Sequence, residues 1–162
     1  MPGILIFSLD HLIPQIRARG GEFSLVFLDL DNFKGVVDGF GHLRGSKVLG
    51  QVARVIHGVL GPEDSLVRYG GDEFIILLPH RAQFETLELT RRLRERLNQT
   101  SFLTDEGLNL RITASYGIAT LPADAQDREG LLNVADKALF SSKDRGKDRI
   151  MLGRDQTPAA EA

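Results

Sequence analysis

Two acidic residues stand beside apolar segments of this chain, and their types and positions suit phosphate chemistry. Asp29 lies near the end of the apolar run SLVFLDLD, residues 24–31, and Asp72 lies in the stretch RYGGDEF, residues 68–74. If the strand over residues 24–31 pairs beside a hairpin carrying the second stretch, the two carboxylates converge at one sheet edge. Such oxygen pairs suit Mg²⁺, which keeps several waters and takes other ligands from substrate phosphates.

Residues around these acids could hold a phosphate. Gly70 and Gly71 lack side chains, so their backbone amides could approach a phosphate closely. Lys143 and Lys147, four residues apart near the end of an expected helix, could supply positive charge, as could Lys34. Phosphoryl transfer mainly requires a positioned metal and positive charge on the phosphate oxygens. The pattern therefore indicates a possible phosphate and metal site, but it names no reaction.

Each of these signals has a structural alternative that the pattern leaves open. GGDE alone suits a hairpin turn with solvated acids, and the lysines could complement a helix dipole. Asp29 and Asp31 could cap a loop. His42 has no partner at a spacing typical of metal ligands, and Ser46 precedes an apolar-periodic run, where a helix N-cap is expected.

The spacing of apolar residues predicts the elements that must position these residues. The expected elements are a helix over residues 9–19, a strand over 24–31, a helix over 47–60, a hairpin around GGDE, a helix over 81–98, a strand over 108–121, a helix over 131–142 and a strand over 149–152. This order predicts an α+β fold with a ferredoxin-like (βαββαβ) core sheet and flanking helices. We expect an N-terminal helix within residues 1–20, a single domain over 21–153 and a disordered tail over 154–162.

Composition narrows the class of protein. A chain of 162 residues is long enough for one domain with a real core, and its net charge of −2 does not favour nucleic acid or an anionic membrane as a partner. Its apolar runs are far shorter than the ~20 residues that a membrane span needs. The absence of cysteine excludes disulfides and thiolate chemistry and fits a reducing compartment, so we expect a cytoplasmic protein.

Four stretches in register resemble the motifs of the GGDEF family of nucleotide cyclases. They are LDLDNFKGVVDGFGHLRGSKVL (28–49), RYGGDEF (68–74), ITASYGIA (112–119) and ADKALFSSKDRGKDRI (135–150). The resemblance covers about residues 20–152 and implies a fold like adenylyl cyclases and polymerase palm domains. It also implies a homodimer in which two bound GTP molecules face each other. Each 3′-hydroxyl then attacks the other α-phosphate, which gives cyclic di-GMP and two pyrophosphates.

The resemblance assigns roles to individual residues. Asp29 and Asp72 would bind Mg²⁺ or Mn²⁺ with help from the Leu30 carbonyl. Asp72 or Glu73 would help to deprotonate the attacking hydroxyl, and Lys143 would be the third catalytic residue. The expected nucleotide-binding residues are Asn32, Phe33 and Lys34 through their backbone amides, Val37, His42 and Ser46 near the base, Gly70 and Gly71 in the turn, and Lys143 and Lys147 as cationic clamps.

Two departures from the family pattern concern the base. Val37 stands where the family usually has asparagine, and Ser46 where it has aspartate. An aspartate accepts hydrogen bonds from guanine, whereas serine can donate or accept and valine does neither. Weaker polar discrimination predicts relaxed purine selectivity. Serine at this position also marks the hybrid promiscuous subgroup, which accepts ATP beside GTP and makes cyclic GMP–AMP.

Other departures bear on regulation and on rival functions. Gly61 stands where the family's product-inhibition motif, RxxD, begins with arginine, so standard feedback inhibition is not expected. The N-terminal stretch PGILIFSLDHL also differs from the family's usual segment. A degenerate domain that binds nucleotide or a partner without turnover is therefore one alternative, and a guanine-specific cyclase is another. The resemblance also implies fusion to a regulatory domain in the full protein.

Overall fold

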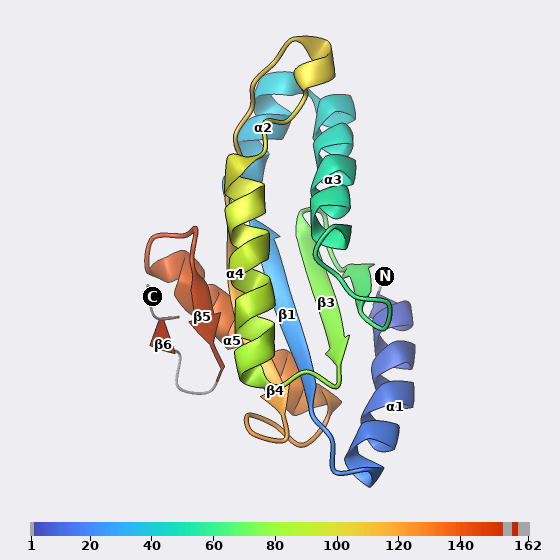
Figure 1. The fold of residues 1–162 in the computed structure, drawn as a ribbon. Coiled ribbons are helices and arrows are strands. Elements are labelled where there is room, and N and C mark those ends of the chain that lie inside the picture. Colours follow the sequence, from blue (N-terminus) through green and yellow to red (C-terminus); the bar gives the residue numbers. More distant parts are fainter. Residues whose placement is uncertain (1, 154–156, 159–162) are drawn as a thin grey trace.

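The polypeptide folds as one mixed sheet with helices on both faces, in a computed structural model that describes residues 2–153 and 157–158 (Figure 1). The elements are α1 (Pro2–Ala18), β1 (Phe23–Leu30), α2 (Phe33–Phe40), α3 (His42–His57), β2 (Ser65–Arg68), β3 (Glu73–Pro79), α4 (Gln83–Gln99), the short 3-10 helix η1 (Thr104–Glu106), β4 (Ala114–Leu121), α5 (Arg128–Asp144), β5 (Ile150–Leu152) and β6 (Thr157–Pro158). None of the helices in this part of the chain combines the length and apolar character that crossing a bilayer requires.

The strand order is β2-β3-β1-β4-β5-β6. β1 is antiparallel to both β3 and β4, and β4 is parallel to β5. The first four strands and their connecting helices therefore have the ferredoxin-like arrangement, with β1 and β3 at the centre and β2 and β4 beside them. The predicted α+β fold class is confirmed.

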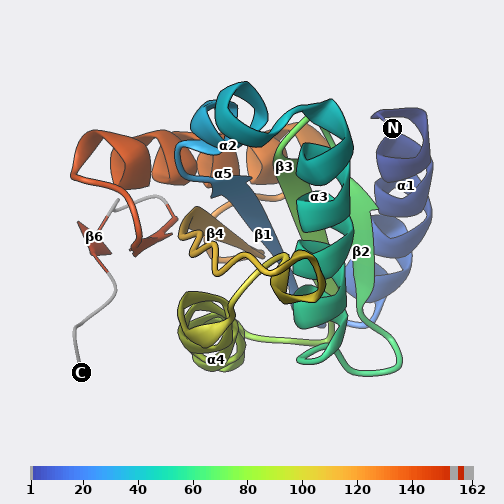
Figure 2. The same cartoon turned by 90° about the horizontal axis from the view of Figure 1, so that it is seen from above.

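Side chains that point alternately to the two faces of the sheet form two hydrophobic cores. Val26, Leu28 and Leu30 of β1 face a core that α3 and α4 cover, whereas Phe23 and Leu25 face a second core under α1 and α5. Figure 2 shows the two helix layers on opposite sides of the sheet. Because successive side chains of a strand point to opposite faces, the continuous apolar run of β1 suits a strand buried on both sides.

Several predicted elements have different bounds in the structure. The helix expected over residues 9–19 begins at Pro2, because Leu5 extends its buried face by one turn. The strand expected over 108–121 begins only at Ala114, which pairs with Leu30, the last residue of β1. Residues before Ala114 lie beyond the end of β1, so they have no strand to extend; Leu110 makes only an isolated bridge with Phe102.

The region between β1 and β2 also differs from the prediction. The sequence pattern gave no sign of α2, an eight-residue helix whose Phe33 and Val36 are buried. α3 begins at His42 rather than at residue 47, so Ser46 lies inside the helix and the N-cap interpretation is wrong. Of the tail 154–162, only Thr157 and Pro158 are described, and they pair with β5; the other tail residues, expected to be disordered, lie outside the described residues.

Candidate functional site

β1 ends beside the start of β3 (Figure 1), and the acidic residues lie at these two strand ends. In the antiparallel pairing of these strands Asp29 lies opposite Glu73, and the Leu30 amide donates a hydrogen bond of 3.1 Å to the Asp72 carbonyl oxygen. The convergence expected for Asp29 and Asp72 thus follows from strand register. α2 starts directly after the end of β1, so its first residues lie beside the acids.

The carboxylate of Asp29 has few groups that stabilise its negative charge. Its Oδ1 atom is buried and has no hydrogen-bond partner among the described residues, while Oδ2 lies 3.5 Å from Lys143 Nζ. Burial raises the pKa of Asp29 to about 6; Lys143 opposes this rise, and the charges of Asp72 and Glu73 add to it. Burial and the charge of Asp72 likewise raise the pKa of Glu73. The cluster therefore favours the binding of additional positive charge.

These residues fit a divalent cation. A buried carboxylate oxygen without a hydrogen bond is a ligand that a hard metal ion would take. The Leu30 carbonyl accepts a hydrogen bond of 3.1 Å from Lys143 Nζ, so the lysine ammonium lies against two of the expected metal ligands, Asp29 and Leu30. No group of three or more Asp, Glu, His or Cys side chains in the described ranges is arranged to hold a metal. Further ligands would come from water and phosphate, which suits Mg²⁺.

Both expected cations of the last helix region reach the end of β1. Lys143, in the last turn of α5, donates a hydrogen bond of 2.8 Å to Asp31 Oδ1. Lys147, in the turn after α5, donates a hydrogen bond of 2.8 Å to the Asn32 side-chain oxygen. Lys34 instead forms an exposed ion pair of 3.0 Å with Asp38 on α2, so its side chain lies with its own helix.

The backbone expected to hold phosphates forms two bends. Asn32 adopts a left-handed conformation (φ 57°) just before α2, and the amides of Phe33 and Lys34 belong to the first turn of that helix, whose N–H groups have no partner within the helix. In the other bend, the Gly70 amide donates a hydrogen bond of 3.4 Å to the Glu73 carbonyl oxygen. A Cβ atom on Gly70 would lie 2.5 Å from Glu73 Oε1, so a side chain at that position would displace the acid; Gly71 has open space.

The residues expected near the base surround the junction of α2 and α3. Val37 is half-buried, and its Cγ2 would lie 3.0 Å from a Cβ atom placed on Gly45 of α3. His42 and Ser46 are exposed and lie one turn apart on α3. Ser46 therefore stands beside the residue that contacts Val37. The structure thus brings Val37 and Ser46 to one junction, with His42 at its edge.

Asp31 is a site residue that sequence reasoning left as a loop cap. It is 5% exposed and accepts hydrogen bonds from four donors, including Lys143 and Thr113. Burial alone would raise the pKa of Asp31, but its hydrogen bonds outweigh burial and hold that pKa below the usual value. The pattern DLD places this acid directly after a buried strand, but the sequence does not show the donors, which come from distant segments.

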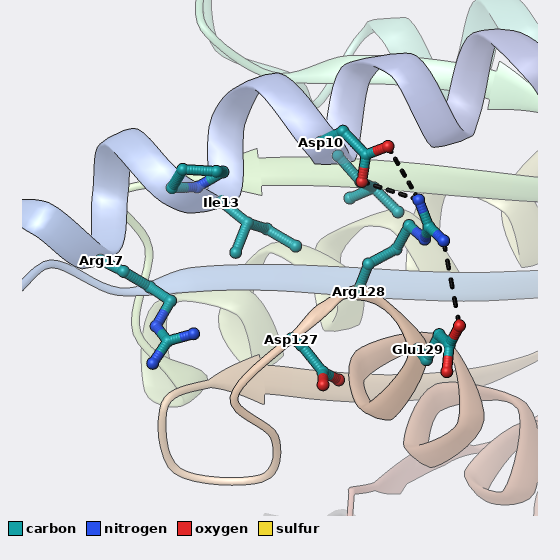
Figure 3. A pocket seen from close by; sticks show the side chains of 8 residues that line it. Asp10, Ile13, Arg17, Asp127, Arg128 and Glu129 are labelled. Carbon is teal, nitrogen blue, oxygen red and sulfur yellow. Dashed lines mark hydrogen bonds and ion pairs between the residues drawn. The ribbon is translucent and has the colours of Figure 1, made fainter.

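A separate hollow of about 530 Å³ lies between α1 and the start of α5 (Figure 3). Its wall contains Leu9 and Ile13, and Arg128 Nη1 donates to both oxygens of Asp10 at 2.7 and 2.8 Å. None of the residues predicted for the metal and nucleotide site lines this hollow. The chemistry inferred from the sequence therefore belongs to the strand ends and not to this hollow.

Known proteins resemble this chain in sequence and in structure. The family model "Diguanylate cyclase, GGDEF domain" matches residues 4–149. Diguanylate cyclase A of Treponema denticola is 32% identical over 155 residues, which cover 94% of this chain and 41% of that protein. Diguanylate cyclase DosC of Escherichia coli is 35% identical over 140 residues, which cover 86% of this chain and 30% of that protein. The chain thus spans less than half the length of these curated relatives.

Solved structures agree with the sequence relatives. The GGDEF domain of the Pseudomonas aeruginosa protein YfiN, also called TpbB, superposes with a TM-score of 0.88 at 26% identity, covering 94% of each chain. The active GGEEF domain of a diguanylate cyclase from Vibrio cholerae superposes with a TM-score of 0.82 at 27% identity, covering 89% of this chain and 90% of that one.

Proposed function

This chain belongs to the GGDEF family of diguanylate cyclase domains, and we propose that it condenses two purine nucleoside triphosphates into a cyclic dinucleotide with release of two pyrophosphates. The substrates are GTP, which gives cyclic di-GMP, and ATP beside GTP, which gives cyclic GMP–AMP. The observation that carries this proposal is that Asp29, Asp72, Glu73 and Lys143 lie together at the end of β1 and the start of β3. A degenerate domain without turnover is the alternative.

The residues divide the reaction between them. Asp29, Asp72 and the Leu30 carbonyl would hold Mg²⁺ or Mn²⁺, which offsets negative charge on the phosphate oxygens when bound. Glu73 or Asp72 accepts the proton of the 3′-hydroxyl; the raised pKa of Glu73 brings that carboxylate closer to the working pH of a general base. Lys143 and Lys147, with the amides of residues 32–34 and of Gly70 and Gly71, bind the triphosphate.

Product formation tests the enzyme against the degenerate alternative. The protein is incubated with GTP, with ATP and with their mixture in the presence of Mg²⁺, and products are identified by mass spectrometry. Because each substrate is bound by a different subunit, the specific activity should rise with protein concentration. Nucleotide binding without pyrophosphate release from any of the three incubations would establish the degenerate alternative; Asp72→Ala serves as the inactive control.

Base selectivity is the finer part of the proposal and rests on Ser46 and Val37. Replacing Ser46 with aspartate restores an acceptor for guanine and should raise the ratio of cyclic di-GMP to cyclic GMP–AMP from equimolar GTP and ATP by about tenfold or more. Ser46→Ala, which restores no acceptor, should leave that ratio close to the wild-type value. A wild-type protein that makes only cyclic di-GMP from the mixture would show ordinary guanine specificity.

Feedback inhibition is not expected, because Gly61 supplies no guanidinium and Asp64 is already paired within the chain. Asp64, 2% exposed, accepts hydrogen bonds from Arg81 Nη2 (2.9 Å) and from the Gly61 amide (2.7 Å). A Cβ atom on Gly61 would lie 3.0 Å from the same Arg81 atom. Adding cyclic di-GMP should therefore leave the initial rate unchanged. Inhibition that disappears in Arg81→Ala would instead show that Arg81 replaces the missing arginine.

The wider setting of the domain is also proposed. A homodimer is required because each triphosphate is attacked by the other. The chain spans 41% and 30% of two curated relatives, which supports a longer protein in which a regulatory domain controls the cyclase. The division into an N-terminal helix (1–20), a cyclase domain (21–153) and a tail (154–162) and the cytoplasmic location stay predictions.

A further inference from the structure

We infer that Asp31 is a positioning residue that holds Lys143 and the turn 145–149 against the end of β1, where the triphosphate binds. The inference rests on the proposed function, since it concerns the same site. Asp31 is not among the residues expected to touch metal or nucleotide. It acts on the substrate through Lys143, whose ammonium it binds at 2.8 Å.

The side chain of Asp31 is fully engaged. Its Oδ1 accepts hydrogen bonds from the Ser115 hydroxyl at 2.7 Å and from Lys143. Its Oδ2 accepts from the Thr113 hydroxyl at 2.6 Å and from the Asp148 amide at 3.0 Å. Four donors match the four acceptor sites of a carboxylate, and only 2% of the side chain is exposed. One buried side chain thus joins the end of β1 to the start of β4, the end of α5 and the turn before β5.

The turn after α5 depends on anchors of this kind. Three consecutive residues, Gly146, Lys147 and Asp148, have φ values of 116°, 67° and 49°. Residues other than glycine rarely adopt this region, and they persist there only where surrounding contacts hold them. Asp31 binds the turn on one side through the Asp148 amide. On the other side, Arg94 Nε of α4 donates to the Asp148 side chain at 3.0 Å.

Among the contacts of Lys143 with described residues, the Asp31 hydrogen bond is the one that involves no expected metal ligand. Lys143 Nζ reaches three oxygens: Asp31 Oδ1, the Leu30 carbonyl and, at 3.5 Å, Asp29 Oδ2. The last two are expected metal ligands, so a bound metal would compete with the lysine for them. Asp31 then keeps the ammonium at the site, where it can turn its other donors to the phosphates.

A purely structural role and a positioning role predict different results. A structural role would lower stability and leave nucleotide affinity unchanged in the molecules that remain folded. A positioning role weakens triphosphate binding through Lys143. Thr113→Val is the matched control, because it removes one hydrogen bond from Asp31 Oδ2 and leaves the contact with Lys143 in place.

The test uses 3′-deoxyGTP with Mg²⁺, because this nucleotide lacks the attacking hydroxyl and cannot be cyclised. Its dissociation constant is measured by calorimetry below the thermal midpoint of each variant. Asp31→Asn should weaken binding by about tenfold or more, whereas Thr113→Val should lower the midpoint and leave the dissociation constant close to wild type. In a Lys143→Met background, adding Asp31→Asn should cause no further loss of affinity.

The outcomes separate this inference from the cyclase proposal. Equal losses of affinity from Asp31→Asn with and without Lys143 would overturn the positioning role, as would unchanged affinity in the single variant. Wild-type protein that binds 3′-deoxyGTP but makes no cyclic product from GTP or ATP would overturn the cyclase and leave the inference standing on binding. Wild-type protein that does not bind 3′-deoxyGTP would overturn both.

Discussion

Asp29→Asn should strongly lower the rate of cyclic product formation and, at the same time, make the metal-free protein more stable at pH 7.5. The loss of activity should be on the order of 10³-fold, because Asp29 as the proposed metal ligand would support several kcal/mol of charge stabilisation in the transition state. The gain in stability follows from the buried oxygen of Asp29 that has no hydrogen-bond partner among the described residues. A neutral amide at this position no longer has to carry a half-buried charge beside Asp72 and Glu73.

The pH dependence of this effect has a definite sign. The pKa of Asp29 is raised in the folded protein to about 6, from an ordinary value of 3.8. The folded state therefore holds this proton more tightly, and the resulting stability is fully present below pH 3.8 and is lost as the pH rises through about 6. Asparagine cannot ionise, so the variant should be more stable than wild type above pH 6. The difference in stability should shrink as the pH falls towards 4.

Thermal unfolding in EDTA at pH 4.5 and 7.5 measures the effect, and each kcal/mol corresponds to about 2–4 °C for a domain of this size. Added Mg²⁺ should raise the midpoint of wild type but not that of Asp29→Asn. Glu129→Gln is the control, because this acid is 82% exposed and lies at the start of α5, away from the strand ends. An Asp29→Asn midpoint below wild type at pH 7.5 would contradict the proposed cost of this buried charge.

Gly117→Ala should cause the largest loss of stability of any single methyl group added to the sheet. Gly117 lies in β4, and a Cβ atom there would lie far inside van der Waals contact of the Ala135 carbonyl oxygen and the Leu139 amide nitrogen of α5. These are backbone atoms, so the helix must move away from the sheet. Overpacking usually costs about 1–3 kcal/mol, and we expect about 3 kcal/mol or more here, equal to a fall of about 10 °C.

The same substitution should impair activity in the molecules that stay folded. α5 carries Lys143 in its last turn, so a shift of the helix also moves the lysine from Asp31. Gly50→Ala is the control: it adds a methyl group to an exposed position of α3 with open space around it, where alanine is the better helix former. Thermal melts and product formation check both variants. A Gly117→Ala midpoint equal to that of Gly50→Ala would show that α5 adapts without cost.

The sequence predicted the central strands and the acidic residues at their ends, because both depend on local patterns. The apolar run of β1 and the GGDE turn are short, and pairing them in register places Asp29 opposite Glu73. α2 could not be predicted in this way, since FKGVVDGF has two glycines in eight residues, which weakens its helical propensity. Packing of Phe33 and Val36 into the core stabilises α2, and that packing appears only in the folded chain.

The extent of β4 and the role of Asp31 were missed for a related reason. LNLRITASYGIATL alternates like a strand throughout, but only the part from Ala114 finds β1 beside it. Asp31 looks like any acid after a strand. Its hydroxyl partners on Thr113 and Ser115 come from the same β4 region, more than eighty residues later in the chain. Tertiary pairing, rather than local propensity, decides both features.

The order of the strands places one part of the site on a central strand and another part next to short outer strands. β1 is paired on both sides along its length, whereas β5 has three residues and is joined to the two-residue β6. Thermal opening of a sheet begins at its short outer strands, because few contacts hold them. Asp29 therefore lies on the strand that is paired on both sides, whereas Lys147 lies in the turn that leads into the short outer strands.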